Sequence, residues 1–194
     1  MKKTLAIILT VLVIATCFAA CGNKNTSGIP NVPEENLSGV KYGSFNKFTA
    51  VDLAGNKVTE NIFKGKKVTM INIWATFCKP CISEMPDLNT LHLEYADKDF
   101  QVIGMVCDVN YLNDSYEPTL YQNTLDIVEM TGVTFTNLLP SQSLDMIKLS
   151  EVYSVPETIF VDENGNIIGD SYVGSRSLEN WKAIVDSVFD SIAE

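Results

Sequence analysis

From residue 45 onward, the chain alternates between two patterns of apolar and polar positions. The segments 68–74 and 100–106 are apolar on both faces, as the central strands of a parallel sheet are. Between these two segments, apolar residues recur at helical spacing from Ile82 to Tyr95. This alternation predicts an α/β fold, in which a central mixed sheet is flanked by helices.

The same patterns place further elements before and after this central unit. An N-terminal β-hairpin extension is predicted from strands at 48–52 and 57–59, which flank the turn Ala54–Asn56. The later elements, in chain order, are a helix at 116–131, a short strand at 135–139, a helix at 142–153, strands at 158–161 and 166–172, and an amphipathic helix at 178–192. We therefore expect one folded domain over residues 45–194.

The first 20 residues differ from the rest and are typical of an export signal. Lys2 and Lys3 precede an apolar run over residues 5–18, which is short for a bilayer span of about 20 residues. The run ends in Phe18-Ala19-Ala20-Cys21, which resembles the lipobox of bacterial lipoproteins. That resemblance implies cleavage of the signal peptide 1–20 and a diacylglyceryl group on Cys21. A plain signal peptide cut elsewhere, or an uncleaved anchor, is the alternative.

Residues 21–44 have a composition that does not support a folded core. They are rich in Gly, Asn, Ser, Pro and charged side chains, and they hold few large apolar residues. We expect a disordered membrane tether here. An ordinary disordered leader would have the same composition.

The charge balance narrows the choice of partners. The sequence carries 24 acidic and 14 basic residues, a formal net charge of −10. Such a surface repels the phosphate backbone, so no nucleic acid partner is expected. It also gains nothing from anionic lipid, so membrane binding would have to come from acyl chains.

Two cysteines, Cys78 and Cys81, stand where the predicted strand 68–74 gives way to a helix. At a helix start, unpaired N–H groups and the positive end of the helix dipole stabilise an anion, so Cys78 is the expected attacking thiolate. Cys81, one turn later, is within reach of a disulfide and is buried enough to resolve a mixed disulfide. Pro80 fits the first helical turn, where no intrahelical N–H is needed.

A Cys-x-x-Cys pair can also bind a metal, but zinc needs four ligands. Apart from Cys21, the chain after residue 20 offers only Cys107 and His92 as further cysteine or histidine ligands. We therefore predict no metal and no organic cofactor. Ile82 stands where a c-type haem site needs histidine. A copper(I)-binding metallochaperone that uses the same thiolates is an alternative, whereas a peroxiredoxin would need Thr in place of Ala75.

Two separate motifs resemble those of the TlpA/ResA-like thiol-disulfide oxidoreductases, which are AhpC/TSA-redoxin-type members of the thioredoxin superfamily. The motifs are Trp74-Ala-Thr-Phe-Cys78-Lys-Pro-Cys81, followed by Glu84 and Pro86, and Ser154-Val-Pro156-Glu-Thr-Ile-Phe-Val-Asp162-Glu-Asn-Gly165. The resemblance covers about residues 45–194. It implies a thioredoxin-like fold for this domain.

The resemblance also implies roles for particular residues. Pro156 would be a cis-proline that faces the disulfide, and the backbone of Val155 would pair with an extended substrate segment. Glu84 would lie beside the active site and either raise the pKa of the thiols or relay a proton; a helix-surface acid is the alternative. The other substrate-binding residues would be Trp74, Phe77, Lys79 and Pro80.

Opposing charges adjoin the two motifs. Lys79 would favour ionisation of the attacking thiol, whereas Glu157, at a position where a neutral residue is common, would oppose it. Cys107 ends an apolar strand and is expected to be a small buried side chain. His92 and Arg176 are expected to be exposed surface residues.

Together these features predict an extracytoplasmic, lipid-anchored enzyme that exchanges electrons with disulfides. The Cys-x-Pro-Cys sequence resembles that of reducing members of the family, which favours reduction of disulfides on exported proteins. Cytochrome c maturation and support of methionine sulfoxide reductase are functions that the resemblance implies. The oxidised protein would need a membrane dithiol electron donor, and a monomer is expected.

Overall fold

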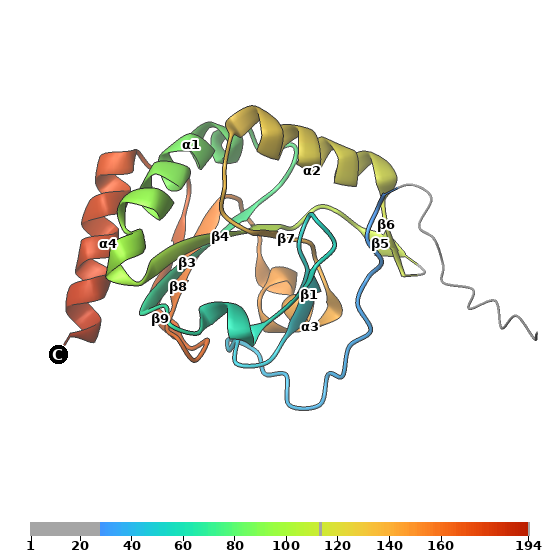
Figure 1. Cartoon of the computed structure of the whole chain (residues 1–194), viewed down its shortest axis with the longest axis horizontal. Coiled ribbons are helices and arrows are strands. Elements are labelled where there is room, and N and C mark those ends of the chain that lie inside the picture. The colour runs from blue at the N-terminus through green and yellow to red at the C-terminus, as the bar shows by residue number, and fades with distance from the viewer. Residues whose placement is uncertain (1–27, 113, 194) are drawn as a thin grey trace, which may run out of the picture.

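The computed structural model describes residues 28–112 and 114–193, and its centre is a five-stranded mixed sheet (Figure 1). The strands are β3 Val68–Trp74, β4 Phe100–Val106, β7 Asn137–Leu138, β8 Glu157–Val161 and β9 Ile167–Val173. Their order is β7-β4-β3-β8-β9. β7, β4 and β3 pair in parallel, whereas β8 is antiparallel to both of its neighbours. The predicted mixed sheet is confirmed, with β3 and β4 at the predicted bounds.

Helices cover both faces of this sheet (Figure 1). The helices are α1 Lys79–Glu94, α2 Pro118–Thr131, α3 Gln142–Ile147 and α4 Leu178–Ile192, and the predicted hairpin consists of β1 Thr49–Val51 and β2 Lys57–Thr59. Met70 and Trp74 of β3 share one apolar core with α1, α2 and α4. Ile71 and Ile73 of the same strand face the other way, into a second core with α3 and the hairpin region. This is the thioredoxin-like arrangement that the sequence predicts.

Two helices are shorter than predicted. α2 begins at Pro118, because the preceding residues form β6 Ser115–Tyr116, which pairs with β5 Tyr111–Leu112. α3 ends before Lys148, whose φ of −153° leaves the helical region. The chain then forms a short 3₁₀ turn and enters the loop before β8. The 3₁₀ turns of the domain are Glu60–Phe63, Ala96–Lys98 and Leu149–Glu151.

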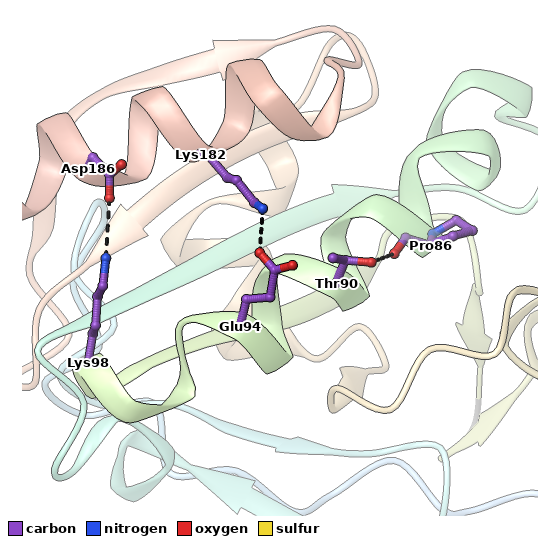
Figure 2. A network of polar contacts seen from close by, with 6 residues as sticks. All are labelled: Pro86, Thr90, Glu94, Lys98, Lys182 and Asp186. Carbon is purple, nitrogen blue, oxygen red and sulfur yellow. Dashed lines mark hydrogen bonds and ion pairs between the residues drawn. The ribbon is translucent and has the colours of Figure 1, made fainter.

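α1 packs beside α4, and two ion pairs join α4 to α1 and to the 3₁₀ turn that follows α1 (Figure 2). Figure 2 shows the ion pair of Glu94 with Lys182 and the ion pair of Lys98 with Asp186 at 3.6 Å. It also shows a hydrogen bond within α1, from the Thr90 hydroxyl to the Pro86 carbonyl oxygen at 3.0 Å. Exposed ion pairs contribute at most about 1 kcal/mol each. The fully buried Leu88, Leu91 and Trp181 therefore contribute more to holding the two helices together.

Residues 28–44 lie along the domain, which corrects the prediction of a free tether for this part of the chain. Ile29 is buried, and the Val32 N–H donates to a carbonyl oxygen between β5 and β6 at 3.1 Å. The carboxylate of Glu35 accepts hydrogen bonds from the first two N–H groups of α3 at 2.8 and 2.9 Å. A carboxylate at this place satisfies donors that the helix itself leaves unpaired. These partners are distant in sequence, so composition alone does not reveal them.

The predicted signal peptide 1–20, Cys21 and residues 22–27 lie outside the described residues. Within the described ranges, no helix is both long and apolar enough to cross a membrane. Attachment through a lipid on Cys21 therefore stays a prediction.

Candidate active site

The two cysteines of the motif form a disulfide at the start of α1. Their Cα atoms are 5.3 Å apart. Cys78 is the N-cap residue of α1, and its Sγ accepts a hydrogen bond from the Cys81 N–H at 3.3 Å. Cys81 is fully buried, while Cys78 retains 5% exposure. The predicted placement at a helix N-terminus, with the second cysteine buried one turn later, is confirmed.

The helix start favours a thiolate at Cys78 once the disulfide is reduced. The N–H groups of the first turn and the positive end of the helix dipole both stabilise an anion at the N-cap. The exposed Lys79 stands next in the chain and adds a positive charge to the same turn. These features point to Cys78 as the nucleophile and to Cys81 as the resolving cysteine.

Asp108, which the sequence analysis did not single out, holds the loop before Cys78 in place. Asp108, just beyond β4, accepts hydrogen bonds from the Thr76 N–H at 3.0 Å and from the Thr76 hydroxyl at 2.6 Å. The Cys78 N–H donates to the Ala75 carbonyl oxygen at 3.0 Å. Because this loop leads into the N-cap, these bonds help to position the Cys78 sulfur.

Glu84 lies on α1, one helical turn after Cys81; it is 3% exposed, and its side chain contacts α4 and the central strand β3. One carboxylate oxygen accepts a hydrogen bond from the Asn72 side-chain amide at 3.2 Å. The other oxygen accepts from the Trp181 indole N–H at 3.2 Å and from the Arg176 backbone N–H at 3.0 Å. The alternative of a helix-surface acid is therefore wrong.

Burial sets the protonation of this carboxyl group. It raises the pKa of Glu84 above its ordinary value, and the opposing effects of the three hydrogen bonds and of the Arg176 charge are each smaller. A carboxyl group that holds its proton more tightly than usual can donate and accept a proton nearer neutral pH. Glu84 is therefore suited to proton transfer beside the buried Cys81.

Arg176 is more than a surface charge, which corrects the sequence-based expectation. Besides its backbone bond to Glu84, its guanidinium lies 5.3 Å from the Tyr172 ring and 5.1 Å from the Trp181 ring. The guanidinium also donates to the Gly174 carbonyl oxygen at 2.6 Å. These contacts order the loop before α4 and hold the N–H that binds Glu84.

The peptide bond between Val155 and Pro156 is cis, as predicted. Pro156 is buried, and its carbonyl oxygen accepts a hydrogen bond from the Gly174 N–H at 2.8 Å. Val155 is half-buried and lines a hollow with Phe77, which is 74% exposed. Lys79 and Pro80 are exposed as well, so the surface predicted to meet substrate is open to solvent.

Trp74 is the exception among the residues predicted to contact substrate. Its side chain is fully buried, and its indole N–H donates to the Asn137 side-chain oxygen at 3.0 Å. Gly104 makes this contact possible, because a Cβ there would overlap the Asn137 amide. Trp74 therefore supports the site from within the core, and its side chain is absent from the exposed surface that the structure describes.

Glu157 does not oppose the cysteines in the way the sequence suggested. It is 5% exposed and forms an ion pair with Lys148 at 2.7 Å, in which both side chains are largely buried. Side chains alternate along β8, and the next residue, Thr158, accepts a hydrogen bond from Asn72 on the Glu84 side of the sheet. Glu157 therefore faces the opposite side, and Lys148 neutralises its charge.

The surroundings of His92 differ from the sequence-based prediction, and those of Cys107 refine it. His92 is half-buried rather than exposed, and its Nδ1 accepts a hydrogen bond from the Val102 N–H at 3.0 Å. Burial lowers the pKa of His92, and the charge of Lys66 adds to this, which favours the neutral form that can accept. Cys107 is half-buried, and burial raises the pKa of its thiol to about 11.

Comparison with known sequences shows which family the chain resembles. A profile of the Redoxin family matches residues 37–185. Thioredoxin-like protein YneN of Bacillus subtilis is 32% identical over 139 residues, which cover 72% of this chain and 75% of that protein. Thiol:disulfide interchange protein DsbE of Vibrio cholerae is 28% identical over 194 residues, or 98% of this chain and 96% of that protein. Thiol-disulfide oxidoreductase ResA of Bacillus thuringiensis is 29% identical over 121 residues, or 62% and 63%.

Solved structures share the fold. A thioredoxin family thiol:disulfide interchange protein from Chlorobium tepidum has a TM-score of 0.59 at 21% identity and covers 80% of this chain and 99% of its own. StoA from Bacillus subtilis has a TM-score of 0.53 at 19% identity, with coverage of 70% and 93%. The fold and the paired cysteines are those of a thioredoxin-like thiol-disulfide oxidoreductase. The chain belongs to the Redoxin family.

Proposed function

We propose that this enzyme is anchored outside the cytoplasm by a lipid on Cys21 and reduces disulfides in exported proteins. The observation that carries the proposal is the disulfide at the start of α1, with Cys78 at the N-cap and Cys81 fully buried behind it. This arrangement leaves Cys78 the more accessible of the two cysteines, at 5% exposure, and keeps Cys81 for the second step.

The reaction uses two thiol-disulfide exchanges. In the reduced enzyme, the Cys78 thiolate attacks one sulfur of a substrate disulfide, and the other substrate sulfur leaves as a thiolate. Cys81 then loses its proton and attacks the Cys78 sulfur, which releases the second substrate thiolate. The substrate gains two electrons and takes up two protons, and the enzyme ends with the Cys78–Cys81 disulfide. A membrane dithiol donor would reduce that disulfide again.

Glu84 is proposed to accept the proton of Cys81 in the second exchange. Cys81 is fully buried, so water has little access to its thiol. Glu84 lies one turn further along the same helix, and burial raises its pKa, which makes it a stronger base than an ordinary carboxylate. It would pass the proton on as the substrate leaves.

The docked N-terminal segment limits how far the enzyme can lie from the membrane. The first buried residue of this segment is Ile29, eight residues after Cys21. Even a fully extended chain spans only about 3.3–3.6 Å per residue, so a lipid on Cys21 would lie within roughly 28 Å of Ile29. The proposed electron donor and substrates would therefore meet the enzyme close to the membrane surface.

Trapping tests the proposal in the full-length chain. Cys81→Ser should stop the reaction at the mixed disulfide and retain exported proteins on Cys78, which mass spectrometry after non-reducing electrophoresis would identify. Apocytochromes c and methionine sulfoxide reductases are the expected candidates. The matched control, Cys78→Ser, should retain far fewer proteins. Equal trapping by both variants, or none by either, would contradict the proposal.

A copper titration tests the alternative of a copper(I) metallochaperone. Within the described residues, no group of three or more His, Cys, Asp or Glu side chains could hold a metal ion, although copper(I) can be bound by two thiolates. Tight copper(I) binding by the reduced protein, together with no reduction of insulin or of a disulfide-bonded haem apoprotein, would favour that alternative.

A further inference from the structure

The N-terminal segment that docks on the domain holds the short helix α3 at both of its ends. We call this segment, residues 28–44, the strap. At the start of α3, the carboxylate of Glu35 accepts hydrogen bonds from the first two N–H groups of the helix at 2.8 and 2.9 Å. At the end of α3, the Gly43 N–H donates to the Ile147 carbonyl oxygen at 3.0 Å. The strap therefore supplies partners for terminal backbone groups that the helix itself leaves unpaired.

The strap is in turn attached to the domain on either side of α3. Figure 1 shows it, in blue, starting beside β5 and β6, where Ile29 is buried and the Val32 N–H donates to the Asp114 carbonyl oxygen at 3.1 Å. Directly after the strap, the Phe45 N–H donates to the Gly165 carbonyl oxygen at 2.8 Å. A Cβ at Gly165 would lie 2.5 Å from the Phe45 backbone, so this close approach requires glycine. Both ends of the strap are thus fixed, and α3 is held between them.

α3 depends on such contacts because it is short. It has six residues, whereas an isolated helix is marginal in water even at about 12–15 residues. Leu144 and Ile147 are buried in the core, and the Ser141 hydroxyl accepts a hydrogen bond from the Leu144 N–H at 3.3 Å. Glu35 binds the two N–H groups that precede this one. The strap therefore helps to set the position of α3.

The end of α3 is connected to the cis-proline by a short loop. We call residues 148–156 the cis-proline loop. Lys148 follows α3 directly and forms its 2.7 Å ion pair with Glu157, the residue after Pro156. Both side chains are largely buried, so this pair joins the end of α3 to the far end of the loop. A shift of α3 would therefore move the cis-proline loop as well.

The strap also contacts the cis-proline loop directly. The Tyr42 hydroxyl donates a hydrogen bond to the carboxylate of Glu151, in the 3₁₀ turn of this loop. That bond is the main cause of a raised pKa of Tyr42, and the charge of Glu157 adds to it, so Tyr42 also lies near the residue after the cis-proline. Tyr42 is 63% exposed, and its contact with the loop therefore depends on the hydroxyl group more than on burial of the ring.

We infer that the strap positions the cis-proline loop for substrate docking, with Glu35 and Tyr42 as positioning residues. The inference rests on the proposed function, in which the backbone of Val155 pairs with an extended substrate segment. Such pairing uses main-chain hydrogen bonds, whose geometry depends on where the loop lies. Glu35 and Tyr42 act through α3 and the loop, so their loss should weaken substrate binding and leave the chemistry of the sulfurs intact.

Reduction of insulin by the full-length enzyme, with dithiothreitol as the electron donor, tests the inference. Glu35→Ala removes the partner of two N–H groups and should raise KM about fivefold, which corresponds to about 1 kcal/mol, with little change in kcat. Tyr42→Phe removes only a hydroxyl group at an exposed position and should raise KM about twofold. Because it leaves the core untouched, Tyr42→Phe decides the question if Glu35→Ala does not fold.

Glu34→Ala is the matched control for Glu35→Ala. Glu34 is the preceding residue and is exposed, and within the described residues its side chain forms no hydrogen bond with α3. The two variants change the net charge equally, so a difference between them reports the contact with α3 and not the charge. Glu34→Ala should keep the KM of the unmodified enzyme.

Hydrogen exchange and alkylation show where the substitutions act. Backbone amides of the cis-proline loop should exchange about fivefold faster in Glu35→Ala, whereas those of α4 should keep their rates. Alkylation of Cys78 by iodoacetamide in the reduced variants should stay within about twofold of the unmodified rate, because the start of α1 is unchanged.

The outcomes separate the inference from the proposed function. An unchanged KM in both strap variants, with insulin still reduced, would overturn the inference and leave the proposed function standing. An equal rise of KM in Glu34→Ala would overturn it too. Faster exchange in α4 as well as in the loop would have the same consequence, because the strap would then stabilise the domain as a whole. Failure of the unmodified enzyme to reduce insulin would instead overturn the proposed function.

Discussion

Two buried glutamates adjoin the two sequence motifs of the active site, yet their surroundings differ. Glu84, 3% exposed, accepts hydrogen bonds from Asn72, Trp181 and one backbone N–H. Glu157, 5% exposed and on the other face of the sheet, forms an ion pair with Lys148 at 2.7 Å. A carboxylate bound by neutral donors can gain a proton without leaving a charge unpaired. Protonation of a carboxylate in a buried ion pair would leave the charge of its partner buried and unpaired.

The difference shows that residue type and distance in sequence do not decide the role of an acid near a reactive cysteine. Both glutamates lie within a few residues of a site residue in the chain. Their partners come from the residue just after α3, from α4 and from the sheet, and these partners make one group suited to proton transfer and the other structural. Variants at each site therefore test whether the two glutamates differ in role.

Removal of Lys148 should have the largest effect. Lys148→Met leaves the carboxylate of Glu157 buried without a counter-charge, which typically lowers the free energy of unfolding by about 3–5 kcal/mol. Urea denaturation at pH 7 measures the loss. The double variant with Glu157→Leu should recover most of it, because no charge is then left unpaired. A loss of less than about 1 kcal/mol in the single variant would show that the pair is not effectively buried.

Glu84→Gln should mainly slow the second exchange. The amide keeps the size of the side chain but accepts no proton, so decay of the mixed disulfide at pH 7 should slow on the order of 100-fold. Quenched-flow analysis of the trapped adduct measures this rate. Glu157→Gln is the matched control, and it should lower stability while changing the rate in the folded enzyme less than threefold. Equal slowing in both variants would remove the distinction between the two glutamates.

The pH dependence of stability provides a further test of Glu84. Because burial raises the pKa of Glu84, the folded state binds its proton more tightly than the unfolded chain does. This contribution to stability is fully present below the ordinary value of 4.5 and is lost as the pH rises through the raised value. The unfolding free energy of Glu84→Gln relative to the unmodified protein should therefore increase from about pH 4.5 upward. A difference that stays flat would contradict the raised pKa.

Trp181→Phe should have the smallest effect. It removes one hydrogen bond to the Glu84 carboxylate, worth about 1 kcal/mol, and the pKa of Glu84 should rise further because a group that lowers it is lost. Carbon NMR of the carboxyl group follows the titration. The control variant Trp74→Phe makes the same change at an equally buried position, but the hydrogen bond that it loses goes to Asn137. It should therefore leave the pKa of Glu84 unchanged.

Local patterns predicted much of the fold and the reacting pair. The strands 68–74 and 100–106 have the predicted bounds, because buried central strands are apolar throughout. Cys78 lies at the N-cap because the strand-to-helix change and Pro80 are both visible in the sequence. The partners of Glu84 and Glu157 were not predictable in this way, since Trp181 is 97 residues from Glu84 and Lys148 lies in the connection between α3 and β8 rather than in a strand beside Glu157.

The docking of residues 28–44 was missed for a related reason. The segment carries few apolar residues, and its contacts are made by single side chains such as Ile29 and Glu35 with distant parts of the chain. Burial of Trp74 and the half-buried position of His92 were missed because each depends on a partner that neither periodicity nor composition reveals.

The most direct test of the central claim is residue-resolved alkylation of the reduced enzyme at pH 7. Brief exposure to iodoacetamide, followed by mass spectrometry, compares the rates at the three cysteines of the domain, Cys78, Cys81 and Cys107. The position of Cys78 at the helix start, the full burial of Cys81 and the raised thiol pKa of Cys107 predict that Cys78 reacts at least about tenfold faster than either. Equal or faster modification of Cys81 or Cys107 would contradict the assignment of Cys78 as the attacking thiol.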